Sequence, residues 1–142
     1  MTASDGSTVS LADYRGKKNV VLYFYPKDFT PVCTRETCGF RDMLAELGDD
    51  TTAVIGVSAD DDASHEEFRS KHQVNFALLT DHDGALAKRF GATASGLGSL
   101  LSKTKRLTFV IDKNGTIVEI LEGALSASKH VDGARAALAK LA

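Results

Sequence analysis

The strongest constraint on the fold is a run of apolar and aromatic residues near the N-terminus. The segment NVVLYFYP, residues 19–26, is almost continuously apolar and has the length of one strand. A strand of this kind is typical of the middle of a sheet that is covered by helices on both faces. Pro26 ends the run, because proline has no N–H to donate to a neighbouring strand. The sequence therefore predicts an α/β fold with this strand inside the sheet.

Strand-like and helix-like segments alternate along the rest of the chain. Further strands are predicted at residues 51–60 (TTAVIGVSAD), 76–81 (FALLTD), 106–112 (RLTFVID) and 116–123 (TIVEILEG). Helices are predicted from about residue 33 to 48, at 64–72, at 83–92 and from about 126 to 142. The early alternation implies parallel crossovers, and Asn114-Gly115 predicts an antiparallel hairpin. The expected architecture is a mixed central sheet with helices on both faces.

The helices are expected to bury apolar residues at helical spacing. In the first helix these are Phe40, Met43, Leu44 and Leu47, with Gly48 as the stop, and in the last they are Val131, Ala134, Leu138 and Leu141. The helix at 64–72 is expected to start at Ser64, with Glu67 as its capping-box partner. Residues 92–105, ATASGLGSLLSKTK, are predicted to form a long mobile loop beside the core.

Composition narrows the class of protein further. The 142 residues suit one domain with a full core, which we expect to span residues 1–142. The net charge is −2 and no basic block stands out, so nucleic acid and anionic membranes are not expected as partners. Apolar runs are too short to span a bilayer, and MTASDGSTVS lacks the features of a secretion signal. We therefore expect a cytoplasmic protein, in which two cysteines are more suited to chemistry than to a disulfide scaffold.

Cys33 stands where the first strand gives way to the first helix. In the first turn of a helix, a thiol meets unpaired N–H groups and the positive end of the helix dipole, which favour the thiolate. The hydroxyl of Thr30, three residues earlier, could donate to the sulfur or to an oxygen bound beside it. The charge of Glu36 opposes the thiolate unless a cation holds it. The polar flanks in TPVCT make burial of Cys33 in a core less expected.

Cys38 lies five residues after Cys33. On an ideal helix this spacing gives a rotation of about 140° and a rise of about 7.5 Å, so the Cα atoms lie roughly 8–9 Å apart. A disulfide tolerates roughly 7 Å. Both cysteines can lie in the helix or be bonded to each other, but not both at once. The spacing predicts a two-state switch in which a disulfide requires the helix start to unwind.

Other interpretations compete for these residues. Cys38 alone could as well be a small buried apolar residue, Pro26 a plain strand terminator, and Arg106 a solvated charge at a strand end. A zinc site is not expected, because His65, His72, His82 and His130 do not cluster with the cysteines in the sequence. We expect these four histidines at the surface or at helix ends.

The residues around the cysteines resemble those of a known family. Pro26, Thr30 and Cys33 reproduce the P-x-x-x-T-x-x-C signature of the peroxiredoxins. The segment YFYPKDFTPVCTRETCGFRD, with its second cysteine, resembles the Q subfamily, also called bacterioferritin comigratory protein. The resemblance extends through DGSTVSLADYRGK, VIGVSADD and RLTFVIDKNG, and so covers most of the chain.

The resemblance implies a thioredoxin-like fold and a thiol peroxidase that reduces hydrogen peroxide and organic hydroperoxides. It implies Cys33 as the peroxidatic cysteine, Cys38 as the resolving cysteine in an intramolecular disulfide, and Arg106 as the family's conserved arginine. Pro26 would wall the pocket, and Thr30 would contact the peroxide. Thioredoxin or a similar dithiol would be the reductant, no cofactor or metal is implied, and a monomer is expected.

Two departures and two alternatives accompany the resemblance. Val32 stands where the subfamily usually has glycine. The chain begins just after the point where the family has a strand with an Ala-Pro segment, which would shorten the N-terminal strand.

A thiol–disulfide oxidoreductase on the same fold is the main alternative, although that activity normally uses C-x-x-C. A redox-sensing or holdase-type binding module is the second alternative.

Overall fold

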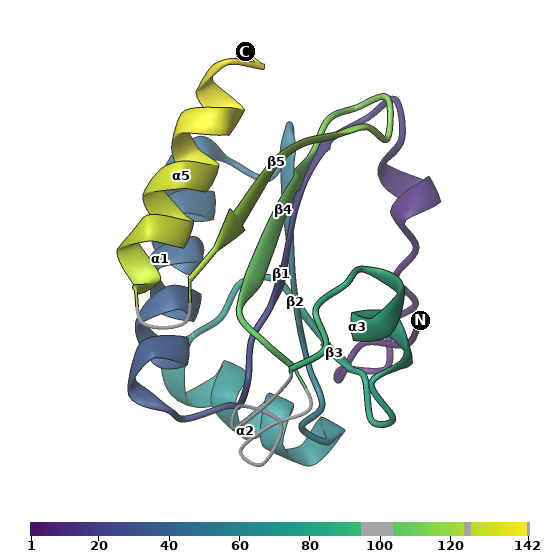
Figure 1. The fold of residues 1–142 in the computed structure, drawn as a ribbon, viewed down its shortest axis with the longest axis vertical. Helices are drawn as coiled ribbons and strands as arrows, with labels where there is room; N and C mark the ends of the chain where they lie inside the picture. Colours follow the sequence, from purple (N-terminus) through teal and green to yellow (C-terminus); the bar gives the residue numbers. More distant parts are fainter. Residues whose placement is uncertain (95–103, 124–125, 142) are drawn as a thin grey trace.

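The computed structural model describes residues 1–94, 104–123 and 126–141. Five strands form one sheet in the order β3-β2-β1-β4-β5, and Figure 1 shows them edge to edge through the centre of the molecule. The strands are β1 (Asn19–Phe24), β2 (Thr52–Ser58), β3 (Ala77–Thr80), β4 (Leu107–Ile111) and β5 (Ile117–Glu122). The predicted strands are confirmed, with ends that differ by at most two residues.

Strand directions also follow the sequence prediction. β1 pairs in parallel with β2, and β2 in parallel with β3, as the early alternation predicted. β4 runs antiparallel to β1 and forms a hairpin with β5. Gly115 in the hairpin turn has a φ of 83°, a conformation that glycine adopts without steric cost. β1 is the middle strand and all six of its residues are buried, which confirms its predicted place.

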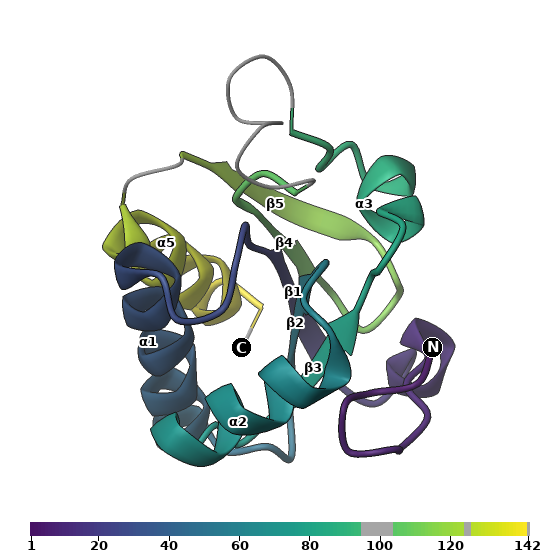
Figure 2. The same cartoon turned by 90° about the horizontal axis from the view of Figure 1, so that it is seen from below.

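Helices cover both faces of the sheet. α1 (Pro31–Leu47) and α5 (Ala127–Ala139) lie side by side on one face, and α2 (Asp62–His72) lies across the lower end in Figure 1. The short α3 (Ala85–Arg89) and a 3-10 turn, η1 (Leu11–Tyr14), lie on the opposite face, as Figure 2 shows from below. The mixed sheet with helices on both faces is therefore confirmed.

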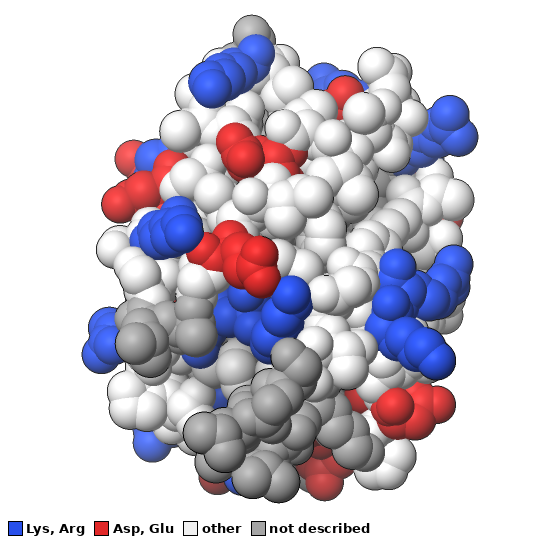
Figure 3. All heavy atoms as spheres, in the orientation of Figure 1, with Lys and Arg blue, Asp and Glu red and all other residues white. Residues whose placement is uncertain are grey.

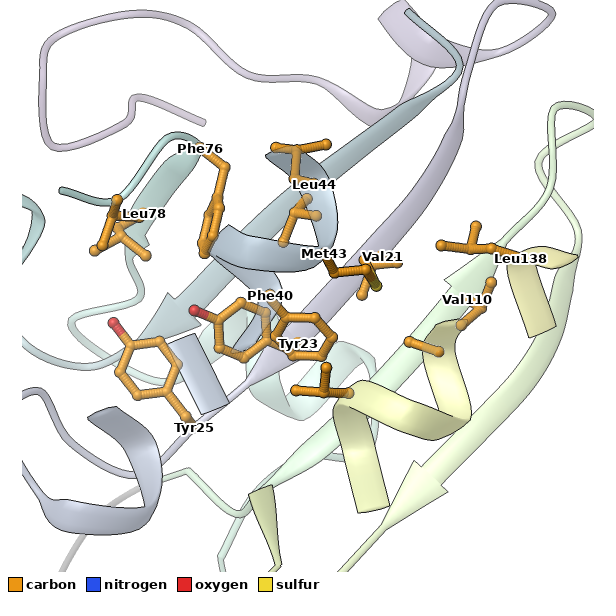
Figure 4. Packing of buried hydrophobic residues seen from close by; sticks show 14 of the residues in the cluster. Val21, Tyr23, Tyr25, Phe40, Met43, Leu44, Phe76, Leu78, Val110 and Leu138 are labelled. Carbon is orange, nitrogen blue, oxygen red and sulfur yellow. The ribbon is translucent and has the colours of Figure 1, made fainter. Parts of the chain in front are cut away.

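The core beneath α1 and α5 is built from large side chains. The rings of Tyr23 on β1 and Phe40 on α1 lie 4.7 Å apart between centroids, and Figure 4 shows them at the centre of this cluster. Val110 on β4 and Leu138 on α5 extend the same cluster. The spacing that predicted Phe40, Met43 and Leu44 as the buried face of α1 is confirmed.

Some sequence predictions were wrong in detail. Leu47 is 43% exposed and is the last residue of α1. α2 is capped by Asp61, whose side chain accepts from the Ser64 N–H, so Ser64 is the third helical residue and not the cap. Most of the predicted loop 92–105 lies outside the described residues.

The described surface has mixed charge. In Figure 3, lysine and arginine side chains alternate with acidic ones over the visible face, and no extended region of one sign is present on it. Within the described residues, no helix combines the length and the apolar character that crossing a membrane requires.

Candidate active site

The first turn of α1 presents Cys33. Thr30 is the N-cap residue, Pro31 is the first helical residue, and Cys33 follows as the third. Proline suits the first helical position, because the N–H that it lacks would have no partner within the helix. The sequence TPVC therefore places the Cys33 thiol among the free N–H groups of a helix start, as the position of the motif predicted.

A buried ion pair completes the surroundings of Cys33. Arg106, the residue before β4, donates from Nη2 to the Cys33 sulfur over 3.0 Å and from Nη1 to Glu36 Oε1 over 2.5 Å. Cys33 and Glu36 are fully buried and Arg106 is 5% exposed. The expectation that Cys33 escapes burial was wrong, and the interpretation of Arg106 as a solvated charge is excluded. The polar flanks misled because the sulfur is buried against an arginine rather than against apolar side chains alone.

The three groups are electrostatically linked. Burial raises the pKa of Glu36 to about 7, and the charge and hydrogen bond of Arg106 only partly offset this effect. Burial would lower the pKa of Arg106, but the Glu36 and Cys33 sites outweigh it and the net shift is upward. Arg106 therefore stays a cation. Its positive charge offsets the negative charge of Glu36, which would otherwise oppose a thiolate at Cys33.

Cys38 lies in the same helix and is half-buried. Both cysteines are free thiols, and both belong to α1, as the spacing predicted for the unbonded state. Arg41 Nη1 donates to the Cys38 sulfur over 3.7 Å and to the His72 carbonyl over 2.7 Å. Cys38 also lines a groove between α1 and the N-terminal part of α5.

A second buried network holds the segment between β1 and α1. Asp28 accepts from the Tyr25 hydroxyl over 2.5 Å, from the Ser64 hydroxyl over 2.8 Å and from His65 Nδ1 over 2.7 Å. The Asp28 N–H donates to Asp60 over 2.8 Å. These bonds tie the segment that leads to Cys33 to the end of β2 and to α2.

His65 lies near the start of α2, one of the two places expected for it, but it is fully buried and not at the surface. Its Nε2 lies 3.1 Å from the Leu79 carbonyl, so both ring nitrogens face acceptors. Burial would lower the pKa of His65, but the hydrogen bond and charge of Asp28 outweigh this and raise it. The two acceptors at its ring nitrogens favour the doubly protonated form of His65, which makes an ion pair with Asp28. Although ligand atoms of Asp28, Asp60 and His65 lie within 4.8 Å of one another, a ring with both nitrogens protonated does not bind a metal.

His130 is the second buried histidine, contrary to expectation, whereas His82 is exposed and His72 is half-buried. His130 lies on α5, and its Nδ1 lies 2.7 Å from the Thr108 hydroxyl and 3.6 Å from Glu36 Oε2. The sequence carried a signal for both buried histidines. His65 is three residues before Phe68 and His130 four before Ala134, so each shares a helix face with a core residue.

The remaining predicted residues surround the helix start. The Thr30 hydroxyl donates to the Lys27 carbonyl over 2.8 Å, and this bond differs from the predicted contact with sulfur. Pro26 is half-buried next to the end of β1. Val32 lies inside α1, where valine is sterically allowed, so glycine is not required there. Phe29, in the segment before α1, has a φ of 66°, which is uncommon for a residue other than glycine.

The AhpC/TSA family matches residues 1–120 of the chain. The chain belongs to this family. Peroxiredoxin Bcp of Bacillus subtilis (strain 168) is 42% identical over 116 residues, which are 80% of this chain and 73% of that protein. The chloroplastic peroxiredoxin Q of Oryza sativa subsp. japonica is 41% identical over 127 residues, 89% of this chain but 57% of that protein. The chain thus spans little more than half the length of this plant relative.

Solved peroxiredoxins confirm the predicted thioredoxin-like fold. Peroxidoxin BcpB of Mycobacterium tuberculosis has a TM-score of 0.89 at 32% identity, and the match covers 100% of this chain and 92% of that one. A structure of Xanthomonas campestris peroxiredoxin Q has a TM-score of 0.87 at 32% identity, and the match covers 98% of this chain and 88% of that one. The resemblance to the Q subfamily that the cysteine segment indicated is therefore confirmed.

Proposed function

We propose that this peroxiredoxin-family chain is a thiol peroxidase that reduces hydrogen peroxide and organic hydroperoxides, with Cys33 as its peroxidatic cysteine. The observation that carries the proposal is the 3.0 Å hydrogen bond from the buried Arg106 guanidinium to the Cys33 sulfur. A charged donor at this distance interacts more strongly with a thiolate than with a thiol. The peroxiredoxin relatives support the same reaction class.

The first step is a displacement at oxygen. The Cys33 thiolate attacks one peroxide oxygen, the O–O bond breaks, and the other oxygen leaves as hydroxide or alkoxide and takes up a proton. Arg106 donates to the sulfur and Cys33 lies in the first turn of α1, so the guanidinium and the N–H groups of that turn can stabilise charge on the departing oxygen. Thr30 is proposed as a further donor to the peroxide and Pro26 as a wall that limits access of water. Cys33 becomes a sulfenic acid.

The second step requires the helix start to open. The Cys38 sulfur attacks the Cys33 sulfenic sulfur, the S–O bond breaks, and water leaves as the disulfide forms. Because both residues lie in α1 at a spacing too long for a disulfide, the turns between them must unwind first. The stability of these turns would then set how long the sulfenic acid survives before a second peroxide overoxidises it.

A dithiol reductant must return both cysteines to thiols, and we propose a protein of the thioredoxin type. Since the proposed resolving cysteine belongs to the same chain, no second copy is needed, and we propose that residues 1–142 act as a monomeric domain. Two free thiols suit a reducing compartment such as the cytoplasm. The rice relative is named chloroplastic, and that name describes the rice protein.

The proposal is tested by mass spectrometry after one equivalent of peroxide. The unmodified chain should form an intramolecular disulfide, Cys38→Ser should accumulate a sulfenic acid at Cys33, and Cys33→Ser should lose peroxide turnover. A disulfide between chains would contradict the intramolecular scheme.

The two alternatives have their own outcomes. Reduction of insulin disulfides faster than consumption of peroxide would favour the thiol–disulfide oxidoreductase. Negligible peroxide turnover, together with partner binding that depends on oxidation, would favour the redox-sensing or holdase module.

A further inference from the structure

The Glu36 carboxyl group has one oxygen that its ion pair does not use. Oε1 accepts from Arg106, whereas Oε2 is buried and has no hydrogen-bond partner among the described residues. His130 Nδ1 lies 3.6 Å from Oε2, and both side chains are fully buried. Burying a carboxylate oxygen without a hydrogen-bond partner costs free energy. The neighbouring His130 ring can therefore influence whether Glu36 is charged.

The His130 ring is fixed from both sides. Its Nε2 lies 2.8 Å from the Gly123 carbonyl oxygen, which can only accept, so Nε2 carries the hydrogen. In the neutral ring Nδ1 therefore has the lone pair, and the Thr108 hydroxyl at 2.7 Å donates to it. These two bonds leave Nδ1 beside Glu36 Oε2 with a single lone pair, which the Thr108 hydroxyl and the Glu36 proton compete for.

The pair can hold one proton in two places. Burial lowers the pKa of His130, and the nearby Arg106 and Lys129 add to this effect against the Gly123 bond. Burial raises the pKa of Glu36 to about 7. With one proton, the pair is either a carboxylic acid beside a neutral ring or a carboxylate beside an imidazolium, whose Nδ1–H then donates to Thr108. In both forms the pair is neutral as a whole.

We propose that His130 is a positioning residue that shares one proton with Glu36 and thereby sets how much negative charge competes with the Cys33 thiolate for Arg106. Among the described residues, the other ionisable groups that interact with the pair are Arg106 before β4, Lys129 on α5 and Tyr23 on β1. Burial raises the pKa of Tyr23 well above its ordinary value, so it stays a neutral phenol. The inference rests on the proposed function only because that function requires a reactive thiolate at Cys33.

Two substitutions separate proton sharing from a structural role. His130→Asn places an amide N–H where it can donate to Oε2, which favours the carboxylate and weakens the thiolate. Thr108→Val removes the donor to Nδ1, so the O–H of a protonated Glu36 can donate to the free lone pair, which favours the neutral carboxyl group and has the opposite effect. Loss of packing would slow both variants alike.

The experiment measures alkylation of Cys33 by iodoacetamide from pH 5 to 9 in a Cys38→Ser chain. At pH 7, His130→Asn should react about three- to tenfold more slowly, because more negative charge on Glu36 competes with the thiolate for Arg106. Thr108→Val should react at least as fast as its parent. Both differences should disappear when Glu36→Gln removes the shared proton. Equal slowing of both variants that persists with Glu36→Gln would overturn the inference.

Two further measurements keep the outcomes distinct. In the same chain, the ¹⁵N resonance of His130 Nδ1 should move near neutral pH and stop moving with Glu36→Gln, and a resonance that ignores Glu36 would overturn the inference. Sulfenic acid formation with peroxide tests the proposed function separately. Absence of that reaction beside the expected alkylation pattern would refute the peroxidase and leave the shared proton standing.

Discussion

Replacing Glu36 by glutamine tests the electrostatics of the site through stability. Because the folded-state pKa of about 7 lies above the ordinary value of 4.5, the folded chain binds this proton more tightly than the unfolded chain. The resulting stabilisation is fully present below pH 4.5 and is lost as the pH rises through about 7. Glutamine has nearly the same shape and no proton to lose.

The size of the effect follows from the two pKa values. Between pH 5 and pH 8, a group with these values loses about 2.5 kcal/mol of its contribution to the free energy of unfolding. Glu36→Gln removes this loss. The free energy of unfolding of the variant, relative to the unmodified chain, should therefore rise by about 2.5 kcal/mol over this range, whatever its value at pH 5.

Urea denaturation at pH 5, 6, 7 and 8 measures this difference. Glu67→Gln, at an exposed position of α2, is the matched control, and its difference from the unmodified chain should stay within about 0.5 kcal/mol at every pH. A Glu36→Gln difference that is equally flat would refute the view that burial keeps this carboxyl group protonated near neutral pH.

Three further perturbations test other parts of the account. A Cβ at Gly39 would lie 2.7 Å from Val131 Cγ2, so Gly39→Ala should destabilise the chain by about 1–3 kcal/mol in thermal unfolding, and Val131→Ala should recover part of the loss. Asp28→Asn should lower the free energy of unfolding by about 3–5 kcal/mol at pH 6 and by less at pH 9. The raised pKa of His65 stabilises the fold below pH 6.5, and this stabilisation is lost as the pH rises through the folded-state pKa. An equal loss at both pH values would contradict the ion pair. Thr30→Val should slow sulfenic acid formation about tenfold or more while Thr30→Ser should not, and equal rates would exclude the hydroxyl as a donor to peroxide.

Local patterns predicted most of the fold. The run at residues 19–26, the Asn114-Gly115 turn and the helical spacing of Phe40, Met43 and Leu44 depend on neighbours in the sequence, and each was confirmed. The cap of α2 was missed because both Asp61 and Ser64 are good capping residues. Pattern alone does not decide between two such residues three positions apart.

The site was predictable only where its residues are close in the sequence. The cysteine motif predicted Cys33 at a helix start and Cys38 in the same helix, and the family resemblance added Arg106. Burial of Cys33 and the roles of Asp28, His65 and His130 depend on residues that the fold brings together from distant elements. Glu36 and Arg106, for example, are 70 residues apart in the sequence. The proposed catalytic roles remain predictions.

We propose that Arg106, through its 3.0 Å hydrogen bond, holds the Cys33 sulfur as a thiolate. The most direct test is the rate of Cys33 alkylation at pH 7 in Cys38→Ser chains that carry Arg106→Gln, with Arg89→Gln, exposed on α3, as the control. With the fold verified by circular dichroism, the account predicts at least a tenfold slower reaction for Arg106→Gln, since about 1.4 kcal/mol is lost with the charged hydrogen bond. A rate within twofold of the Arg89→Gln control would contradict it.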